Sequence, residues 1–385
     1  MASPLKVLIV GASGVFGSRL AELAVREEGI SLTLGARNLS KLEKVAQELA
    51  GPVNLARIDR DMVKAVDLTG YDLIIDAAGP FQSSHTNLVE AAIGARVAYL
   101  DLADGREFIA HFPSFDGEAK AAGVPLVTGA SSIPALSHAV LDALVAGWRA
   151  VDSVRIGIYP GNRAPRGRSV VEAILSYVGK PVRVFREGEW QNVAGWGGMH
   201  REQIAGIGPR WASVCDTPEQ DLLVGRYKPR QSAEFFAGLE LGLLHVGLWL
   251  CSLPVRIGIL RSLRPFAGPM LAMAELLRPI GSDRGAMTVR ARGADAAGDP
   301  VERCWVLRAD ANRGPYVPIL AALAMMRRFR DGTGPNAGAL VCSGLLEFAD
   351  FAPDMAKLEM EHWLEGEATQ LGFDSAGSAL QSSAA

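Results

Sequence analysis

Short apolar runs alternate with helix-like stretches along the first 150 residues of this 385-residue chain. The runs are almost entirely apolar, as is typical of strands covered on both faces of a parallel sheet. The predicted strands are Lys6–Val10, Ser31–Gly35, Val53–Ile58, Leu73–Ala77, Ala98–Asp101 and Leu126–Thr128, and helices are predicted to begin near Val15, Asn38, Ser83 and Pro134. Strands that alternate with helices build β-α-β units. Residues 1–150 are therefore expected to form an α/β domain with the doubly wound parallel sheet of a Rossmann fold.

The first of these strands runs straight into a glycine loop and a helix. In a Gly-x-x-Gly-x-x-Gly loop the first glycine permits a tight turn, the second lets the backbone approach a pyrophosphate, and the third lets the helix pack close to the strand. The N-terminus of the helix adds free N–H groups and a partial positive charge. The loop therefore predicts a dinucleotide site, which consists of Gly11, Ala12, Ser13, Gly14, Val15, Phe16 and Gly17.

The pattern changes after residue 150, where strands become alternating or rich in β-branched residues. The predicted strands are Val154–Tyr159, Val182–Arg186, Met287–Arg292 and Cys304–Ala309, and the predicted helices are Ser169–Val178 and Pro318–Phe329. We expect residues 151–335 to form an α+β domain for substrate binding and dimerisation. Residues 336–373 are expected to hold C-terminal helices, Gly338–Phe348 and Pro353–Gln370, that return to the first domain. Residues 374–385 are rich in Ser, Ala and Gly and are expected to be a disordered tail.

One long apolar segment, residues 235–280, lies inside the second domain. It is rich in Leu, Gly and Met, and arginines occur at Arg256, Arg261, Arg264 and Arg278. A transmembrane helix needs about 20 uninterrupted apolar residues, and Glu240, His245, Pro254 and Arg256 interrupt this run. Two interpretations stay open. The segment is either a buried helical hairpin or lid over an apolar substrate, or a contact with a membrane surface.

The composition of the chain and the absence of several motifs argue against several classes of function. The net charge of −3 gives no electrostatic reason for a nucleic-acid partner. The four cysteines are widely separated, which indicates free thiols in a reducing compartment, and we expect a cytoplasmic protein. The six histidines show no metal-binding spacing, so no metal site is predicted. No Gly-x-Ser-x-Gly nucleophile elbow is present, and none of the six tyrosines is followed by lysine at the fourth position, so tyrosine–lysine reductase chemistry is not indicated.

The second strand ends without the acidic residue that binds the ribose of NAD. Arg37 and Asn38 follow it instead. A carboxylate would repel a 2′-phosphate, whereas a guanidinium can form two charge-assisted hydrogen bonds to it. The sequence therefore predicts that NADP(H) is preferred over NAD(H). Asp59 after the third strand is expected near the adenine, and four residues after the fourth strand are expected to pass under the cofactor, Ala77, Ala78, Gly79 and Pro80.

Four loops together resemble one family. They are Gly11–Gly17, Asp76–Phe81, Tyr99–Asp104 and Val127–Ala135. They are similar to successive loops in the NADP-binding domain of the saccharopine dehydrogenase family, over roughly the first 140 residues, and a weaker similarity recurs at residues 334–346. The resemblance implies a pyridine-nucleotide oxidoreductase that acts on C–N bonds, on related polyamine intermediates, or, in lipid-linked branches, on substrates that are not known.

Hydride transfer needs a proton donor or acceptor beside the nicotinamide, at the carboxyl ends of the strands. The candidates there are Tyr99, Asp101, Asp104 and Ser131. A second candidate site lies on a Gly/Pro loop, where Arg163, Arg166 and Arg168 are expected to hold an anionic group of a small-molecule substrate.

These observations predict an NADP(H)-dependent oxidoreductase that transfers hydride at a C–N or carbonyl-type centre, and a homodimer is expected. Two alternatives stay open. One is an enoyl reductase of a lipid or polyketide substrate, because residues 235–280 suit a greasy ligand. The other is a non-catalytic NADP-binding protein at a membrane surface.

Overall fold

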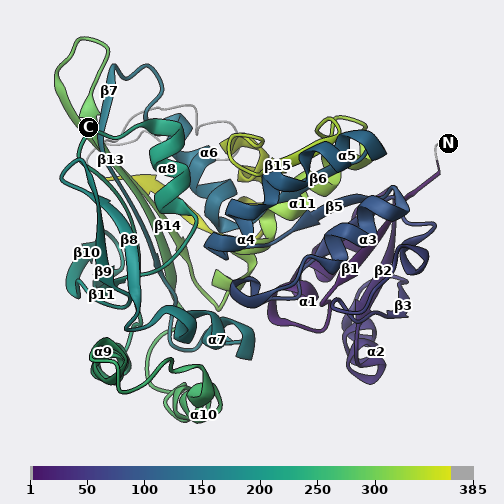
Figure 1. Ribbon diagram of the computed structural model, residues 1–385, viewed down its shortest axis with the longest axis horizontal. Helices are drawn as coiled ribbons and strands as arrows, with labels where there is room; N and C mark the ends of the chain where they lie inside the picture. The colour runs from purple at the N-terminus through teal and green to yellow at the C-terminus, as the bar shows by residue number, and fades with distance from the viewer. Residues whose placement is uncertain (1–2, 366–385) are drawn as a thin grey trace, which may run out of the picture.

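The computed structural model describes residues 3–365. Two β-sheets stand side by side with helices around and between them, and their buried apolar residues form one core cluster (Figure 1). The first sheet has seven strands and the second has nine. The C-terminal tail expected at 374–385 lies outside the described residues.

The first sheet is parallel throughout, with the order β15-β6-β5-β4-β1-β2-β3. Its strands are β1 (Leu5–Val10), β2 (Ile30–Ala36), β3 (Asn54–Arg57), β4 (Leu73–Asp76), β5 (Ala98–Asp101), β6 (Pro125–Thr128) and β15 (Gly338–Val341). The order reverses between β1 and β4, and a crevice opens at such a switch point, outside the carboxyl ends of the strands. The expected doubly wound α/β fold is confirmed, together with the predicted positions of the first six strands.

Helices cover both faces of this sheet, as the apolar strands require. They are α1 (Val15–Ala24), α2 (Leu39–Glu48), α3 (Asn87–Ala95), α4 (Arg106–His111), α5 (Asp116–Ala122) and α11 (Val317–Arg330). The sequence analysis missed α4 and α5, because each is short and spans only about two turns. It also placed the start of α3 four residues too early, at Ser83 rather than Asn87.

Part of the chain expected in the second domain packs on the first sheet. Helix α11 packs against α1 of the first sheet, and Arg327 and Arg330 in its last turn form ion pairs with Glu27, at 2.7 and 3.1 Å. The helix expected at Gly338–Phe348 is instead strand β15, which pairs with β6 from Gly338 to Val341. The prediction of a helix was wrong because a four-residue buried strand has too few positions to show a period.

The second sheet is mixed. Its main path is β10-β11-β12-β7-β13-β14-β16, and β8 pairs with both β12 and β9. Its strands are β7 (Ala150–Tyr159), β8 (Pro181–Arg186), β9 (Glu189–Ala194), β10 (His200–Ile204), β11 (Gly208–Val214), β12 (Ser232–Ala237), β13 (Gly285–Ala294), β14 (Pro300–Ala309) and β16 (Glu361–Leu364). Only β7 and β12 pair in parallel. The helix expected at Pro353–Gln370 is the short α12 (Ala352–Lys357), and β16 follows it.

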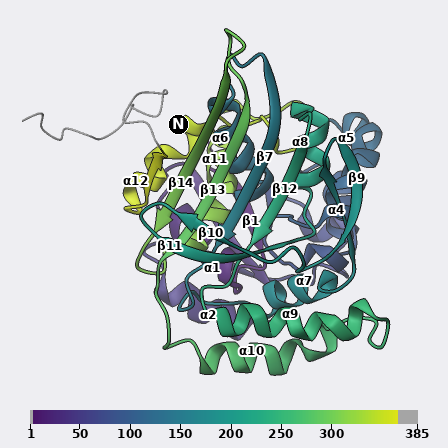
Figure 2. The same cartoon turned by 90° about the vertical axis from the view of Figure 1, so that its left-hand side faces the viewer.

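Four further helices accompany the second sheet: α6 (Ser137–Leu144), α7 (Arg168–Tyr177), α8 (Glu219–Tyr227) and α9 (Gly242–Arg256). Helix α10 (Ala267–Leu276) runs beside α9, and both lie at one end of the molecule (Figures 1 and 2). The apolar segment expected at 235–280 thus contains the end of β12 and both of these helices. No helix within residues 3–365 has the length and apolar character needed to cross a bilayer.

Candidate active site

The glycine loop forms one wall of the crevice at the switch point. Gly11 has a positive φ of 81°, and a Cβ on it would lie 2.8 Å from the Cα of Ala78 in the loop after β4. A Cβ on Gly17 would overlap the carbonyl oxygen of Gly11. Glycine at both positions is therefore required by the close packing of β1, α1 and the loop after β4.

The middle glycine is required for another reason. Gly14 is exposed at the N-terminus of α1, has an ordinary φ of −84°, and no side chain in the described part of the chain caps this helix end. A Cβ here would meet only the Gly11 carbonyl oxygen, at 3.2 Å. The surface is thus a bare peptide backbone at the positive end of a helix, which fits a diphosphate. Ala12 and Gly17 of the predicted site are buried and serve the packing instead.

The loop after β4 packs directly against the glycine loop, and a buried ion pair braces it. Nε of Arg60 lies 2.6 Å from Oδ2 of Asp76. Asp76 also accepts a hydrogen bond from the backbone N–H of Ala78, at 2.9 Å, and Arg60 donates to the carbonyl of the same residue, at 3.1 Å. Burial raises the pKa of Asp76 against the effect of the guanidinium. The small residues Ala77 to Pro80 are therefore held in one conformation beside the glycine loop.

Tyr99 and Asp101 lie beneath the crevice rather than in it. Both side chains are completely buried, and the Tyr99 hydroxyl donates to Asp76, at 3.2 Å. Oδ1 of Asp101 accepts hydrogen bonds from the backbone of Ala103 and Gly129, at 2.9 and 2.8 Å, and from the Thr128 hydroxyl, at 2.9 Å. Both side chains are therefore closed off from solvent in this structure. Both instead fix the loops after β5 and β6.

Burial raises the pKa of Asp101 to about 7, in spite of the backbone hydrogen bonds that it accepts. A carboxyl group with a higher pKa in the folded than in the unfolded chain stabilises the fold while it is protonated, and this contribution is lost as pH rises through about 7. We expect the free energy of unfolding to fall more steeply from pH 5 to pH 8 in the wild type than in Asp101→Asn. Urea titrations at four pH values measure this, with the exposed Asp61→Asn as control. Parallel curves would contradict the assignment.

The other two proton-transfer candidates lie closer to the crevice. Asp104 is partly buried and accepts a hydrogen bond from the side-chain amide of Gln82, at 3.0 Å, and burial raises its pKa. Ser131 is buried, whereas the next residue, Ser132, lines the large cavity described below. Ser132 is itself buried as well.

The residues expected around the adenosine end lie at the edge of the same crevice. Arg37 follows β2 and is exposed, and within residues 3–365 it forms no ion pair. Asn38 caps α2, because its side chain accepts from the backbone N–H of Lys41, at 3.2 Å, and from the Ser40 hydroxyl, at 2.7 Å. Asp59 is partly buried after β3 and accepts from the backbone of Asp61, at 3.2 Å. Of these three side chains, Arg37 is exposed and has no hydrogen-bond or ion-pair partner in residues 3–365, and Oδ2 of Asp59 also accepts no hydrogen bond there.

A large apolar cavity extends from the glycine loop into the second sheet. Its volume is about 620 Å³. Phe16, Ser132 and residues of the segment 314–318 at the start of α11 line one side, and α7 with the loop before it, α9, α10 and strands of the second sheet line the other. A Cβ on Gly167, just before α7, would lie 3.4 Å from Cγ2 of Val15. The start of α7 therefore packs closely against the start of α1. The apolar lining includes Ile158, Val170, Val171, Ile174, Leu239, Leu244, Leu248, Met270, Leu277 and Met287.

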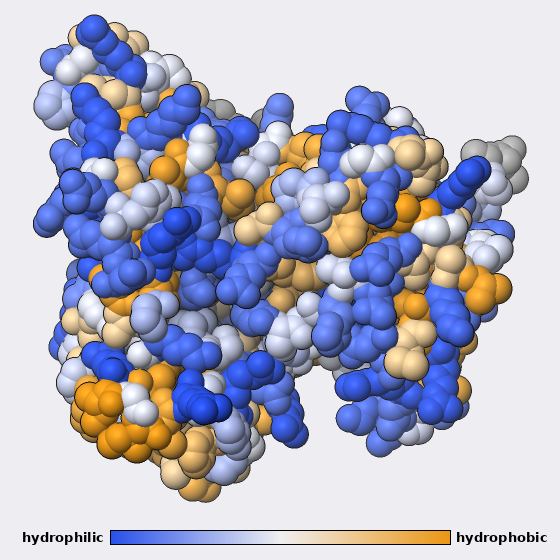
Figure 3. Space-filling view, in the orientation of Figure 1, coloured by the Kyte–Doolittle hydropathy of each residue, from blue (hydrophilic) through white to orange (hydrophobic). Residues whose placement is uncertain are grey.

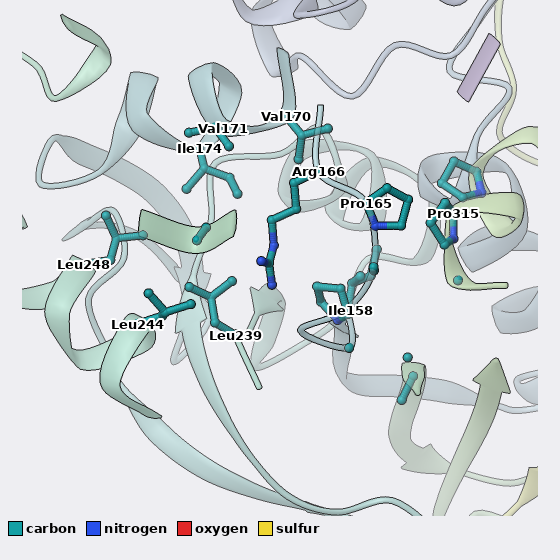
Figure 4. A pocket seen from close by; sticks show the side chains of 18 of the residues that line it. Ile158, Pro165, Arg166, Val170, Val171, Ile174, Leu239, Leu244, Leu248 and Pro315 are labelled. Atoms are coloured by element: carbon teal, nitrogen blue, oxygen red, sulfur yellow. The ribbon is translucent and has the colours of Figure 1, made fainter. Parts of the chain in front are cut away.

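One guanidinium projects into this apolar lining. Arg166 points between Val170, Leu239 and Ile158 (Figure 4). Its Nη2 donates to Oδ1 of Asn162, at 2.9 Å, while its buried Nη1 has no hydrogen-bond partner in residues 3–365. Burial lowers the pKa of Arg166. A buried donor without a partner is costly, so this nitrogen is suited to an oxygen atom of a ligand.

The other two arginines of the predicted substrate loop are not in the cavity. Arg163 is exposed and donates to the carbonyl of Pro279, at 3.3 Å. Arg168 is also exposed and forms an ion pair with Glu172, at 2.7 Å. Of the three arginines, Arg166 lines the apolar cavity, whereas Arg163 lines a separate pocket with Arg278 and Asn312.

Three polar residues of the site escaped the sequence analysis. Arg60 braces the loop after β4, and Ser132 and Asp283 line the cavity. Arg60 follows Asp59 at the end of β3, in the position where a parallel sheet directs side chains towards its ligand edge, and that placement was the available signal. Asp283 lies just before β13, and nothing in its sequence surroundings indicates that it lines a cavity together with Phe16 of the glycine loop.

Comparisons with known proteins agree with this geometry. Residues 7–141 match the family model of the saccharopine dehydrogenase NADP binding domain. A carboxyaminopropylagmatine dehydrogenase from Synechocystis sp. is 35% identical over 104 residues, and the matched part covers 26% of this chain and 26% of the relative. The chain is thus aligned with about a quarter of that relative's length.

The fold as a whole also has a solved counterpart. Saccharopine dehydrogenase (L-Glu forming) from Saccharomyces cerevisiae superposes with a TM-score of 0.67 at 12% sequence identity, over 94% of this chain and 99% of the yeast protein. At this identity the likeness shows the fold. The resemblance predicted from four loops is confirmed: this chain has a saccharopine dehydrogenase-like fold, and its residues 7–141 match the model of that family's NADP-binding domain.

Proposed function

We propose that this protein is an NADP(H)-dependent oxidoreductase whose substrate is a long apolar molecule with an oxygen-bearing head group. The apolar cavity of about 620 Å³ carries the proposal, because it begins at Phe16 of the glycine loop. A volume of this size falls in the range of small-molecule sites. A bound nicotinamide cofactor supplies or accepts the hydride, and the cavity holds the substrate against it.

The polar groups of the cavity fit such a molecule. Arg166 offers an unpaired N–H to a carboxylate or carbonyl oxygen. Ser132 follows β6 by four residues and lines the same cavity as Phe16 of the glycine loop. It is placed to donate a proton to the reacting substrate, or to accept one.

Two types of bond are candidates for the reduction. The family resemblance favours a C–N or carbonyl-type centre. The apolar lining favours an enoyl C=C bond of an acyl chain, because a substrate with several charged groups would leave them unpaired against aliphatic side chains. The name of the Synechocystis relative describes a substrate with carboxy and amino groups, and the charged residues that line the cavity within residues 3–365 are Arg166 and Asp283.

A substrate panel tests the proposal. Purified protein is mixed with NADPH and with dodecanal, trans-2-dodecenal, or an imine formed from dodecanal and butylamine, and loss of absorbance at the NADPH wavelength is followed. Short analogues of two to four carbons serve as controls, and we expect turnover to rise with chain length because burial of each CH₂ contributes about 0.8 kcal/mol. Equal rates for short and long members would contradict an apolar substrate. Cofactor binding without turnover of any member would favour the non-catalytic alternative.

Arg37→Ala tests the preference for NADP(H). Arg37 is exposed beside the adenosine end of the crevice, free of ion pairs within residues 3–365. Loss of a charge-assisted contact with a phosphate costs about 2 kcal/mol, so we expect the affinity for NADPH to fall about 30-fold and that for NADH by less than twofold. Calorimetry with both cofactors measures the two values. Equal losses would show that Arg37 does not contact a 2′-phosphate.

A further inference from the structure

Helix α9 buries polar residues and exposes apolar ones, which is the reverse of a usual helix at a water-exposed surface. Its buried residues are His245, Ser252 and Val255. His245 is held by Ser213, whose hydroxyl lies 2.9 Å from Nε2. Leu243, in contrast, is 75% exposed, and Leu250 and Leu253 are exposed as well. An amphipathic helix that meets water places its apolar residues on the protein side, so the outer face of α9 is suited to an apolar medium.

Helix α10 and the chain around it extend the same surface. The sequence of α10 is apolar apart from Glu275, yet Ala267 is its one buried residue. Met273 and Leu276 are exposed. A helix that is apolar all round is normally covered by protein or lipid. Ile257, Ile259 and Phe266 between the helices and Ile280 after them are exposed too, and together they form one apolar patch at the lower left of Figure 3.

The charges around this patch are mainly positive. Residues 256–280 contain four arginines, Arg256, Arg261, Arg264 and Arg278, against a single carboxylate, Glu275. Glu275 already pairs with Arg278, at 3.4 Å. Arg261 is exposed and has no ion pair within residues 3–365. Arginines beside an apolar face are typical of surfaces that bind anionic lipid.

A second copy of this chain fits the patch less well than a bilayer does. In a twofold dimer the same patch would lie on both sides of the interface. The arginines of one copy would then approach those of the other, and like charges across an interface cost several kcal/mol. An anionic bilayer instead offers an apolar interior to the leucines and phosphates to the arginines.

The patch is continuous with the apolar cavity. Leu243 of α9 and Met273 of α10 are exposed on the patch and also line the cavity. Leu244, Leu248 and Leu277 of the same helices line it further inside. The cavity is therefore walled by the two helices whose outer faces form the patch.

We propose that α9, α10 and the segment between them dock on an anionic lipid bilayer, so that the cavity opens towards the membrane. The docking is argued from the patch alone, whereas delivery of a membrane-resident substrate into the cavity rests on the proposed function. The apolar side chains enter the interfacial region of the bilayer, and Arg261 and Arg264 remain at the level of the phosphates.

Flotation of the full-length protein with lipid vesicles tests the docking. One vesicle is phosphatidylcholine and the other contains 30% phosphatidylglycerol. We expect at least about fivefold more protein on the anionic vesicles, and a decrease at 0.5 M salt. The double variant Ile257→Ser and Ile259→Ser should reduce binding to the level of phosphatidylcholine, since both side chains, 71% and 72% exposed, lie outside the cavity lining.

The matched control changes two equally exposed apolar side chains elsewhere. Met62→Ser and Val66→Ser, at 74% and 73% exposure beside the first sheet, should leave flotation unchanged. Light scattering of each variant tests for a dimer instead. The proposal would be overturned if the wild type forms a dimer and does not float with vesicles, and if the Ile257/Ile259 variant is a monomer. Equal loss in both double variants would overturn it too. NADPH calorimetry on the same samples separates these results from a failure of the proposed function.

Discussion

Replacing Gly14 by valine is expected to lower the affinity for NADPH at least about a hundredfold without unfolding the protein. Gly14 has an ordinary φ of −84°, and the tightest contact of an added Cβ is 3.2 Å, so the chain can accept a side chain there. The new isopropyl group would stand at the bare N-terminus of α1, where a diphosphate has to approach the backbone. Calorimetry with NADPH and thermal unfolding of the same sample measure the two effects.

A matched control lies on α8. Gly225 is exposed, and a Cβ on it meets no atom within 4 Å, so Gly225→Val makes the same change in open space. We expect unchanged NADPH affinity for this variant. An affinity for NADPH in Gly14→Val within threefold of the wild type would show that no diphosphate lies against the glycine loop.

Arg166→Met is expected to weaken binding of an apolar ligand with an anionic head while leaving the fold about as stable as before. The buried Nη1 has no partner in residues 3–365, and removing it relieves a desolvation cost. The bond from Nη2 to Asn162 is lost at the same time. The two effects oppose each other, so we expect the free energy of unfolding to change by less than about 1 kcal/mol.

The binding measurement uses a dansyl-labelled undecanoate, which combines an apolar chain with one carboxylate and becomes fluorescent in an apolar site. Loss of a hydrogen bond to a charged group costs about 1.5–3 kcal/mol, which corresponds to a Kd between about 10 and 100 times higher. Arg168→Met, in which an exposed ion pair is removed, should change the Kd less than twofold. Equal Kd values for the wild type and Arg166→Met would remove Arg166 from the site.

The first sheet could be predicted from the sequence because its strands are short, apolar and separated by helices. Residues Val7 to Val10 and Leu73 to Asp76 are buried, and a glycine loop follows the first of these strands. Strand β15 could not be found, since its four residues pair with β6 from more than 200 positions away and show no period of their own. The position of such a strand in the sheet depends on pairing with residues far away in the sequence, which a local sequence pattern cannot predict.

Within the site, the glycine loop and Arg37 could be recognised from the local sequence pattern, whereas the role of the catalytic candidates could not. Asp101 stands at the carboxyl end of a strand, which is typical of ligand-binding residues, but three hydrogen bonds from neighbouring loops occupy its Oδ1. Arg166 was found in a run of three arginines that looked equivalent in sequence. The turn before α7 directs one of them inward, and the difference depends on packing against α9 and α10.

Strand β15 has a practical consequence for anyone who wishes to produce the cofactor-binding part alone. A fragment that stops near residue 150 contains the whole stretch recognised by the family model, yet it lacks both β15 and α11. Strand β6 would then become an exposed edge strand with unpaired peptide groups. Such edges pair with strands of other chains and so promote aggregation. A soluble truncation would have to graft residues 314–345 back on through an engineered linker.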